Sequence, residues 1–274
     1  MMSIEWPLVF FSIFTGIACG MFFSLVYLAE YQGKALDKRL KVSILVLICM
    51  AAGGFCAQLH LGHPERMFGA LGHPTSGIFM EAAVEFTLGA IIVAYMLAVH
   101  REAGVAVTKT LGTIGAVVAA VMAFINGDTF VMASRPAWNT LFLPICYIAS
   151  AGVLGAFALN LLLGEDEDAY YALQRLLLKV IGVQAVVLLL YLVMVAIAPY
   201  PDYSRSLQRI FAGDIAPFSW LGILIVGMGL PVKFIKDGKA AKMALTSFIC
   251  VLAGALSFRI MMFLIGSSVR NFFG

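Results

Sequence analysis

Eight long apolar segments dominate this chain of 274 residues and leave few folds open to it. Most are close to the roughly 20 residues with which an α-helix spans a bilayer. Because the segments are continuous rather than alternating, they favour helices over the strands of a membrane barrel. Hydrophobic residues make up 62% of the chain and charged residues 12%, which excludes a water-soluble core. The segments are Pro7–Ala29, Val42–Leu61, Phe79–Val99, Thr110–Asn126, Leu141–Leu163, Val180–Ala198, Phe218–Ile235 and Met243–Ile265.

The connections between these segments are short, which leaves no room for a soluble domain. We therefore expect an all-α integral membrane protein, a bundle of eight transmembrane helices, with residues 1–274 forming a single transmembrane domain. The fourth segment is shorter than the others and could continue to about Ala133.

The distribution of positive charge predicts how the bundle is oriented. Loops that hold twelve of the 18 Lys and Arg residues share one side of the membrane, and the loops on the other side hold five. The positive-inside rule places the first side in the cytoplasm, so both termini are expected outside. The three tryptophans agree, because all fall at the outer ends of predicted helices, where indole prefers the interface: Trp6, Trp138 and Trp220.

Four ionisable residues lie inside or at the ends of the apolar segments. His60 closes the second, Glu81 and Glu85 open the third, and Arg259 lies within the eighth. Charged groups are costly against lipid, so these side chains are expected to face protein or a polar cavity. With a rise of about 1.5 Å per residue, His60 and Arg259 lie roughly 27 and 24 Å from the inner ends of their helices. All four are therefore expected in the outer part of the membrane, where an acid, a base and a cation suit proton-coupled redox chemistry.

Each of these residues also has a purely structural interpretation. His60 could cap the second helix, Glu81 could form an ion pair, and Glu85 could pair with Arg66. Arg259 could neutralise a buried carboxylate. The segment after His60 contains Gly62 and Pro64, which permit a close turn and prevent an ordinary helix from continuing. Unwound backbone at this depth must be buried in protein or hydrated.

The sequence offers no ligand set for a metal, a haem or an iron–sulfur cluster. Its five cysteines are scattered through apolar segments without a CxxC pair. Three of its four histidines crowd one end of the bundle and the fourth lies at the other, so no facing pair is available for bis-histidine haem ligation. We therefore expect neither haem nor an iron–sulfur cluster on this chain.

Several motifs carry a resemblance to a known family. They are Glu5-Trp6-Pro7-Leu8, the run Leu59-His60-Leu61-Gly62-His63-Pro64-Glu65-Arg66-Met67-Phe68, Glu81 early in the third helix, Pro136-Ala137-Trp138, and Ala253-Gly254 followed by Arg259. Over essentially its whole length the chain resembles the membrane-anchor subunit of the DMSO reductase family. Near Arg259 it departs from that pattern, because Ala255 and Met261-Met262 replace more polar and aromatic residues.

The resemblance implies a menaquinol-oxidising anchor in the inner membrane of a prokaryote. Such an anchor passes electrons to an iron–sulfur subunit, which feeds a molybdopterin catalytic subunit in anaerobic respiration, so this chain would be a non-autonomous part of an oxidoreductase. It also implies that His60 and Glu81 act on the quinol. Gly62, Pro64, Arg66, Glu85 and Arg259 complete the expected quinol site. Lipid is the only other expected partner, and no nucleic acid is expected.

The chemistry of the residues agrees with this interpretation. A quinol loses two electrons and two protons, and a neutral imidazole and a carboxylate can accept hydrogen bonds from its hydroxyls. The main alternative is a proton-coupled secondary transporter, which predicts inverted repeats and a polar path through the midplane. The sequence shows no clear repeat, and its inner half is apolar.

Overall fold

The structure is a computed structural model that describes residues 4–59, 61, 69, 72–73, 75–163, 168–197 and 202–266. Four of the expected site residues, His60, Gly62, Pro64 and Arg66, lie outside this part of the chain.

The described residues form helices and no strands, and eight of the helical stretches are long and apolar enough to cross a membrane. The predicted all-α bundle with eight spans is therefore confirmed. The elements are α1 (Trp6–Val26) with η1 (Tyr27–Tyr31), η2 (Leu36–Lys38) with α2 (Arg39–Gln58), α3 (Gly77–His100), α4 (Val105–Asp128), η4 (Pro136–Trp138), α5 (Phe142–Leu163), α6 (Tyr170–Ile197), α7 (Asp202–Ala212), η5 (Phe218–Gly229) with α8 (Leu230–Lys236), and α9 (Ala244–Ile265).

Two helices differ from their predicted bounds for the same physical reason. The proposed extension of the fourth segment to about Ala133 is wrong, because α4 ends at Asp128 and gains its length at the other end, from Val105. The sixth helix likewise begins at Tyr170, well before Val180. Lys109 lies in the first turns of α4, and Arg175 and Lys179 lie in those of α6. Long cationic side chains can extend their charges to the interface while their stems remain on the helix, so a charge interrupts an apolar run without ending the helix.

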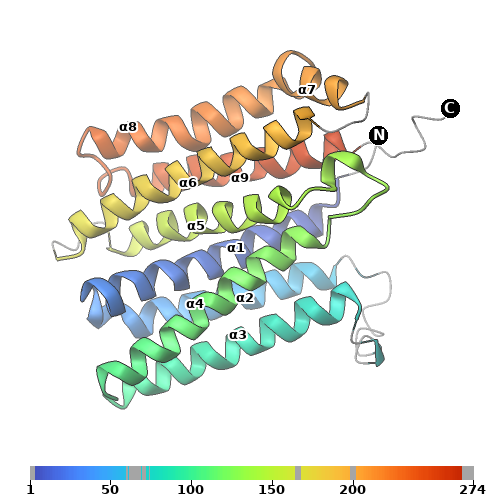
Figure 1. Cartoon of the computed structure of the whole chain (residues 1–274). Helices are drawn as coiled ribbons and strands as arrows, with labels where there is room; N and C mark the ends of the chain where they lie inside the picture. The colour runs from blue at the N-terminus through green and yellow to red at the C-terminus, as the bar shows by residue number, and fades with distance from the viewer. Residues whose placement is uncertain are drawn as a thin grey trace.

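The helix α1 lies at the centre of the bundle. It packs against α2, α4 and α5, and most of its residues are buried. One side of the bundle holds α5, α6, α8 and α9, while α2 and α3 lie on the other side of α1 (Figure 1). Since α1 begins and α9 ends at the same end of the bundle (Figure 1), the chain crosses it an even number of times, as eight spans require.

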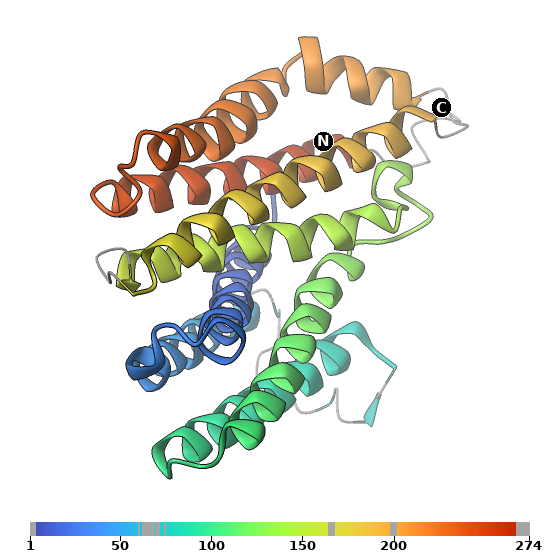
Figure 2. The same ribbon diagram turned by 60° about the vertical axis from the view of Figure 1, so that its left-hand side comes forward.

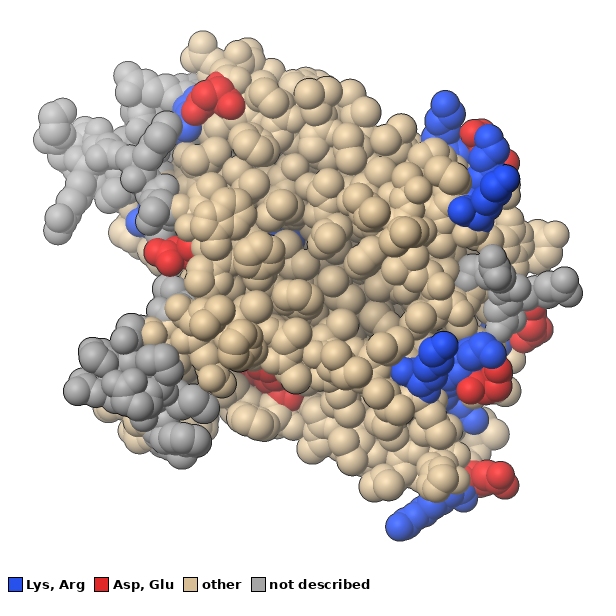
Figure 3. All heavy atoms as spheres, turned by 180° about the vertical axis from the view of Figure 1, so that it is seen from behind, with Lys and Arg blue, Asp and Glu red and all other residues tan. Residues whose placement is uncertain are grey.

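The charged surface agrees with a membrane-spanning bundle. Seen from behind, Lys and Arg gather with acidic residues at one end, and an almost uncharged belt covers the middle (Figure 3). That end is where α1 finishes, and it is the end expected in the cytoplasm. We call it the inner end and the opposite one the outer end; their assignment to the two sides of the membrane remains a prediction.

The short helix α7 was not expected from the sequence. It lies at the outer end between α6 and η5 (Figure 1). Its Arg209 pairs with Asp214 at 2.8 Å and also donates to the carbonyl of Leu264 in the last turn of α9, at 3.1 Å. The hydrogen bond from Arg209 lowers the pKa of Asp214. One arginine thus ties the α7 segment to the end of α9.

A buried carboxylate joins four helical elements at the inner end. The side chain of Glu30 in η1 is only 2% exposed. Its oxygens accept hydrogen bonds from the hydroxyl of Tyr95 in α3 at 2.6 Å and from that of Thr108 in α4 at 3.0 Å. It also forms an ion pair with Arg39 of α2 at 3.2 Å. Glu30 is not among the site residues expected from the sequence, although an acid at the end of an apolar segment in a membrane protein is a signal in itself.

Replacing Glu30 with Ala is expected to destabilise the bundle by about 3 kcal/mol, at the lower end of what breaking a buried ion pair costs, because Arg39 is partly exposed. The variant leaves the buried hydroxyl of Tyr95 and the guanidinium of Arg39 without their acceptor. Thermal unfolding of the purified protein in detergent measures the loss. Asp37→Ala is the matched control, since Asp37 forms an exposed pair with Lys38 and should leave the melting temperature unchanged. Equal melting temperatures for both variants would contradict the structural role of Glu30.

Candidate functional site

Glu81 and Glu85 lie in the second and third turns of α3, near the outer end of the bundle. The helix begins after Ser76, whose hydroxyl accepts a hydrogen bond from the backbone N–H of Phe79 at 3.2 Å, an ordinary N-cap. The spacing of four residues puts both carboxylates on the same face of the helix. Both side chains are partly buried. The two acids therefore share one face of α3.

Two adjacent glycines of α2 shape the wall opposite Glu85. A Cβ atom at Gly54 would lie 3.7 and 3.8 Å from the two carboxylate oxygens of Glu85, so this side chain reaches α2 at that point. At Gly53, a Cβ atom would lie 2.8 Å from the hydroxyl of Thr15 in α1. Because neither glycine has a side chain, α1 and the acidic face of α3 can both approach α2 closely.

The end of α4 provides a third wall, next to Glu81. The side chain of Thr129 lies beside the Glu81 carboxylate, and its hydroxyl donates to the carbonyl of Asn126 at 3.3 Å. Its methyl group faces Gly77, where a Cβ atom would lie 3.7 Å away. Thr129 therefore orients the region around Glu81 and links α3 to α4.

Two polar atoms of the neighbouring helices α1 and α4 are buried without a hydrogen-bond partner among the described residues. They are the hydroxyl of Thr15, which is 0% exposed, and the side-chain oxygen of Asn126, which is 3% exposed. A buried polar atom without a partner is costly, so such atoms point to a place where water or a ligand can bind. Sequence reasoning missed Thr15, Asn126 and Thr129. The signal that could have found them is a lone polar residue within or just after an apolar segment.

Arg259 is buried on the other side of α1. Only 1% of it is exposed, and all its described hydrogen bonds go to uncharged groups. It donates to the hydroxyl of Ser12 at 2.6 Å and to the carbonyl of Ser12 at 3.2 Å, both in α1. It also donates to the hydroxyl of Ser150 in α5 at 3.3 Å and to the carbonyl of Ala255 at 3.1 Å. Its guanidinium lies 5.0 Å from the ring centre of Tyr147, a cation–π contact.

The structure thus divides the expected cluster into two parts. Glu81 and Glu85 come together between α2, α3 and α4, while the described contacts of Arg259 go to α1, α5 and its own helix. No described contact joins Arg259 to either acid, so the structure does not support the idea that Arg259 neutralises them. The physical reason is that α1 occupies the centre of the bundle.

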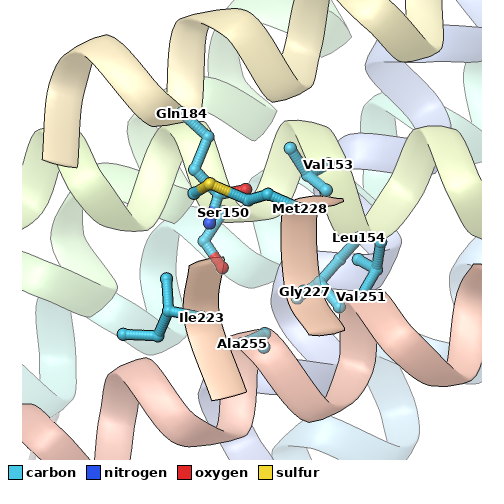
Figure 4. Close-up of a pocket in the computed structure, with 10 residues that line it drawn as sticks. Ser150, Val153, Leu154, Gln184, Ile223, Gly227, Met228, Val251 and Ala255 are labelled. Carbon is cyan, nitrogen blue, oxygen red and sulfur yellow. The ribbon is translucent and has the colours of Figure 1, made fainter. Parts of the chain in front are cut away.

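A small cavity lies next to the partners of Arg259. It is enclosed by α5, α6, η5 and α9, and its wall includes Ser150, Gln184, Met228 and Ala255 (Figure 4). Its volume is about 10 Å³, enough for one water molecule and far too small for a quinone ring. In this conformation, the surroundings of Arg259 hold the helices together and leave no room for a substrate.

Within the described part of the chain, no group of three or more His, Cys, Asp or Glu residues is arranged to hold a metal ion. The cysteines that the structure describes are all unpaired thiols, and Cys19, Cys146 and Cys250 are buried.

The fold and these residues define a multi-pass helical membrane protein that carries ionisable groups within its bundle. The chain belongs to the DMSO reductase anchor subunit (DmsC) family, whose model matches residues 1–266. A similar protein is the C subunit of the anaerobic dimethyl sulfoxide reductase of Haemophilus influenzae, 26% identical over 179 residues. The match covers 63% of this protein and 63% of that relative, somewhat less than two thirds of the relative's length. The family resemblance predicted from the sequence is therefore confirmed.

Proposed function

We propose that this chain oxidises a menaquinol at the outer end of its bundle and passes the electrons to an iron–sulfur subunit of a molybdopterin-dependent reductase. The observation that carries the proposal is the position of Glu81. It is partly buried at the outer end of α3, beside Thr129 at the end of α4. The segment that begins with His60 connects α2 to this helix. Membership of the DMSO reductase anchor subunit family supports a role in a membrane-bound reductase complex.

The chemistry assigned to these residues follows from what a quinol must lose. Glu81 accepts a hydrogen bond from one quinol hydroxyl and takes its proton, while His60 accepts from the other hydroxyl through a neutral ring nitrogen and takes the second proton. The two electrons leave together with the two protons in the overall reaction. Thr129 holds Glu81 in place, and Glu85, one turn deeper on the same face, extends the polar wall of the site. Gly62, Pro64 and Arg66 form the remaining wall in this proposal.

Arg259 has a different part in the proposed mechanism. Its hydrogen bonds to Ser12 and Ser150 fix α1 against α5 and α9. It therefore supports the wall behind the site through α1, rather than touching the quinol ring. Glu81 and Glu85 thus belong to the proposed quinol site, whereas Arg259 has a structural role outside it.

The proposed setting is the inner membrane of a prokaryote, with both termini and the quinol site facing outside. Protons from quinol oxidation would then leave on the outer side. The iron–sulfur and molybdopterin subunits would dock at the same end, so electrons need not cross the membrane.

Isolation of the complex tests this proposal. The chain should be purified from its native membrane in mild detergent, and the proteins that accompany it identified by mass spectrometry. We expect an iron–sulfur protein and a molybdopterin protein in equal amounts with the chain. A chain that purifies alone, under conditions in which other respiratory complexes stay intact, would contradict the proposal and favour the transporter.

The interior argues against that transporter. A polar path would have to link Glu85 to the inner cluster around Glu30, which Tyr95 joins from α3. Between Glu85 and Tyr95, α3 turns Leu88 and Ile92 inward, and both are 0% exposed. The two polar regions are therefore separated by packed apolar side chains.

A further inference from the structure

A second, larger cavity lies between the helices. It has a volume of about 350 Å³ and is bounded by α1, α4, α5 and α6. In Figure 2, α4 approaches the beginning of α5 at one end and leans away from α5 and α6 toward its own beginning. We call this cavity the α4–α6 groove.

The walls of the α4–α6 groove are almost wholly apolar. Its floor contains Gly20 of α1 and Gly152 of α5, and Ala120 and Val183 stand on opposite sides, in α4 and α6. Val183 is exposed on the surface that faces the membrane. A groove of this kind offers no hydrogen-bond partners to water, so in a bilayer an apolar chain fills it.

Cationic side chains surround the inner mouth of the groove. Lys179 of α6 is the one charged residue among the described residues that line it, and its side chain is exposed. Arg175 lies one turn earlier on the same face of α6. Across the mouth, Lys109 of α4 lies 4.4 Å from the ring centre of Tyr31, one turn beyond Tyr27, which lines the groove.

The acidic groups that the structure describes near this mouth already have cationic partners. Glu30 is paired with Arg39, and Asp168 is paired with Lys34 at 2.5 Å. Among the described residues, Lys179, Arg175 and Lys109 therefore leave the mouth with a net positive charge. An apolar groove that ends in cations complements an amphiphile with an apolar tail and an anionic head.

We propose that the α4–α6 groove binds an anionic phospholipid, with one acyl chain along Gly152 and Val183 and the phosphate between Lys179, Arg175 and Lys109. Basic pockets between transmembrane helices bind anionic head groups in this manner, and the inner end of the bundle is the end expected in the cytoplasm. The proposed head-group site is separate from the quinol chemistry, because its cations Lys179, Arg175 and Lys109 lie at the inner end of the bundle, opposite to Glu81.

Lipid titration of the delipidated protein tests this site. The full chain, with whatever subunits accompany it, should be stripped of lipid in detergent and given phosphatidylglycerol or phosphatidylcholine with the same acyl chains. We expect phosphatidylglycerol to raise the melting temperature and to remain bound in native mass spectrometry, and phosphatidylcholine to do so clearly less. In the double variant Lys179→Gln, Arg175→Gln, the stabilisation by phosphatidylglycerol should fall by at least half.

Two further variants test whether the position of the cation and the open volume of the groove each matter for lipid binding. Lys236→Gln removes an exposed cation at the inner end of α8, outside the groove, and should keep the full effect of phosphatidylglycerol. Gly152→Leu should abolish the effect by filling the groove, since a Cβ atom there meets only Val180, at 3.8 Å. Equal stabilisation by both lipids, an unchanged response in the double variant, or a quinone retained in place of the phospholipid would each overturn the proposal.

Discussion

Glu81→Gln is expected to lower quinol-dependent turnover by about 100-fold or more, which is what loss of a positioned general base costs. The amide keeps the size of the side chain and can still accept a hydrogen bond, but it cannot take a proton at neutral pH. The variant should therefore impair oxidation more than binding, with kcat falling further than KM changes. His60→Ala should reduce the same activity, since it removes the second proposed acceptor. Turnover with a soluble menaquinol analogue measures both effects.

Two measurements separate this outcome from a folding defect. Turnover with an artificial soluble electron donor bypasses the anchor and should remain normal in both variants. Glu102→Gln is a matched control, because Glu102 is an exposed acid in the tight turn between α3 and α4, far from the site. Normal quinol oxidation in both Glu81→Gln and His60→Ala would show that these residues are structural, and would leave the proposed site without its chemistry.

The positions of the eight spans were predictable because a membrane-spanning helix is encoded by a run of consecutive apolar residues. A helix that crosses a bilayer must satisfy its backbone internally and present apolar side chains over its whole length, and both requirements can be read from consecutive residues. The starts of α4 and α6 were harder to predict, since Lys109 and Arg175 belong to helices although they interrupt apolar runs.

The candidate site was only partly predictable because its partners depend on how the helices pack. Depth along a helix placed Glu81, Glu85 and Arg259 at similar levels, and this inference used the helical rise alone. Depth does not say which helix stands between two residues. The central position of α1 gives Arg259 hydroxyl and carbonyl partners and separates it from the acids.

Small residues gave a weaker signal than charges. Gly53 and Gly54 bring α1 and the acidic face of α3 close to α2, yet they appear in the sequence only as two glycines in an apolar run. Gly16 and Gly20 of α1 form a GxxxG pair, a motif of close helix contact that does not identify the partner helix. The partner is α5, which packs along α1.

The crossing of α1 and α5 supports the second large expected effect. A Cβ atom at Gly155 would overlap the backbone of Gly20 and Met21, and one at Gly20 would overlap the backbone of Ala151. These obstacles are main-chain atoms of two long, buried helices, so no rotamer change can relieve them. Gly155→Ala must instead push α1 away from α5, at a cost of about 3 kcal/mol or more, the upper end of the usual cost of overpacking.

Gly16→Ala provides the control for this crossing on the same face of α1. A Cβ atom there would meet the Leu154 side chain at 3.5 Å and Ala151 at 3.7 Å, which are ordinary van der Waals contacts. We therefore expect Gly155→Ala to reduce sharply the yield of monodisperse protein and its melting temperature, and Gly16→Ala to resemble the wild type. Equal stability of the two variants would mean that α1 and α5 do not cross backbone to backbone at Gly20. The hydrogen bonds of Arg259 would then be in doubt as well, because its partners Ser12 and Ser150 belong to α1 and α5, the two helices that cross there.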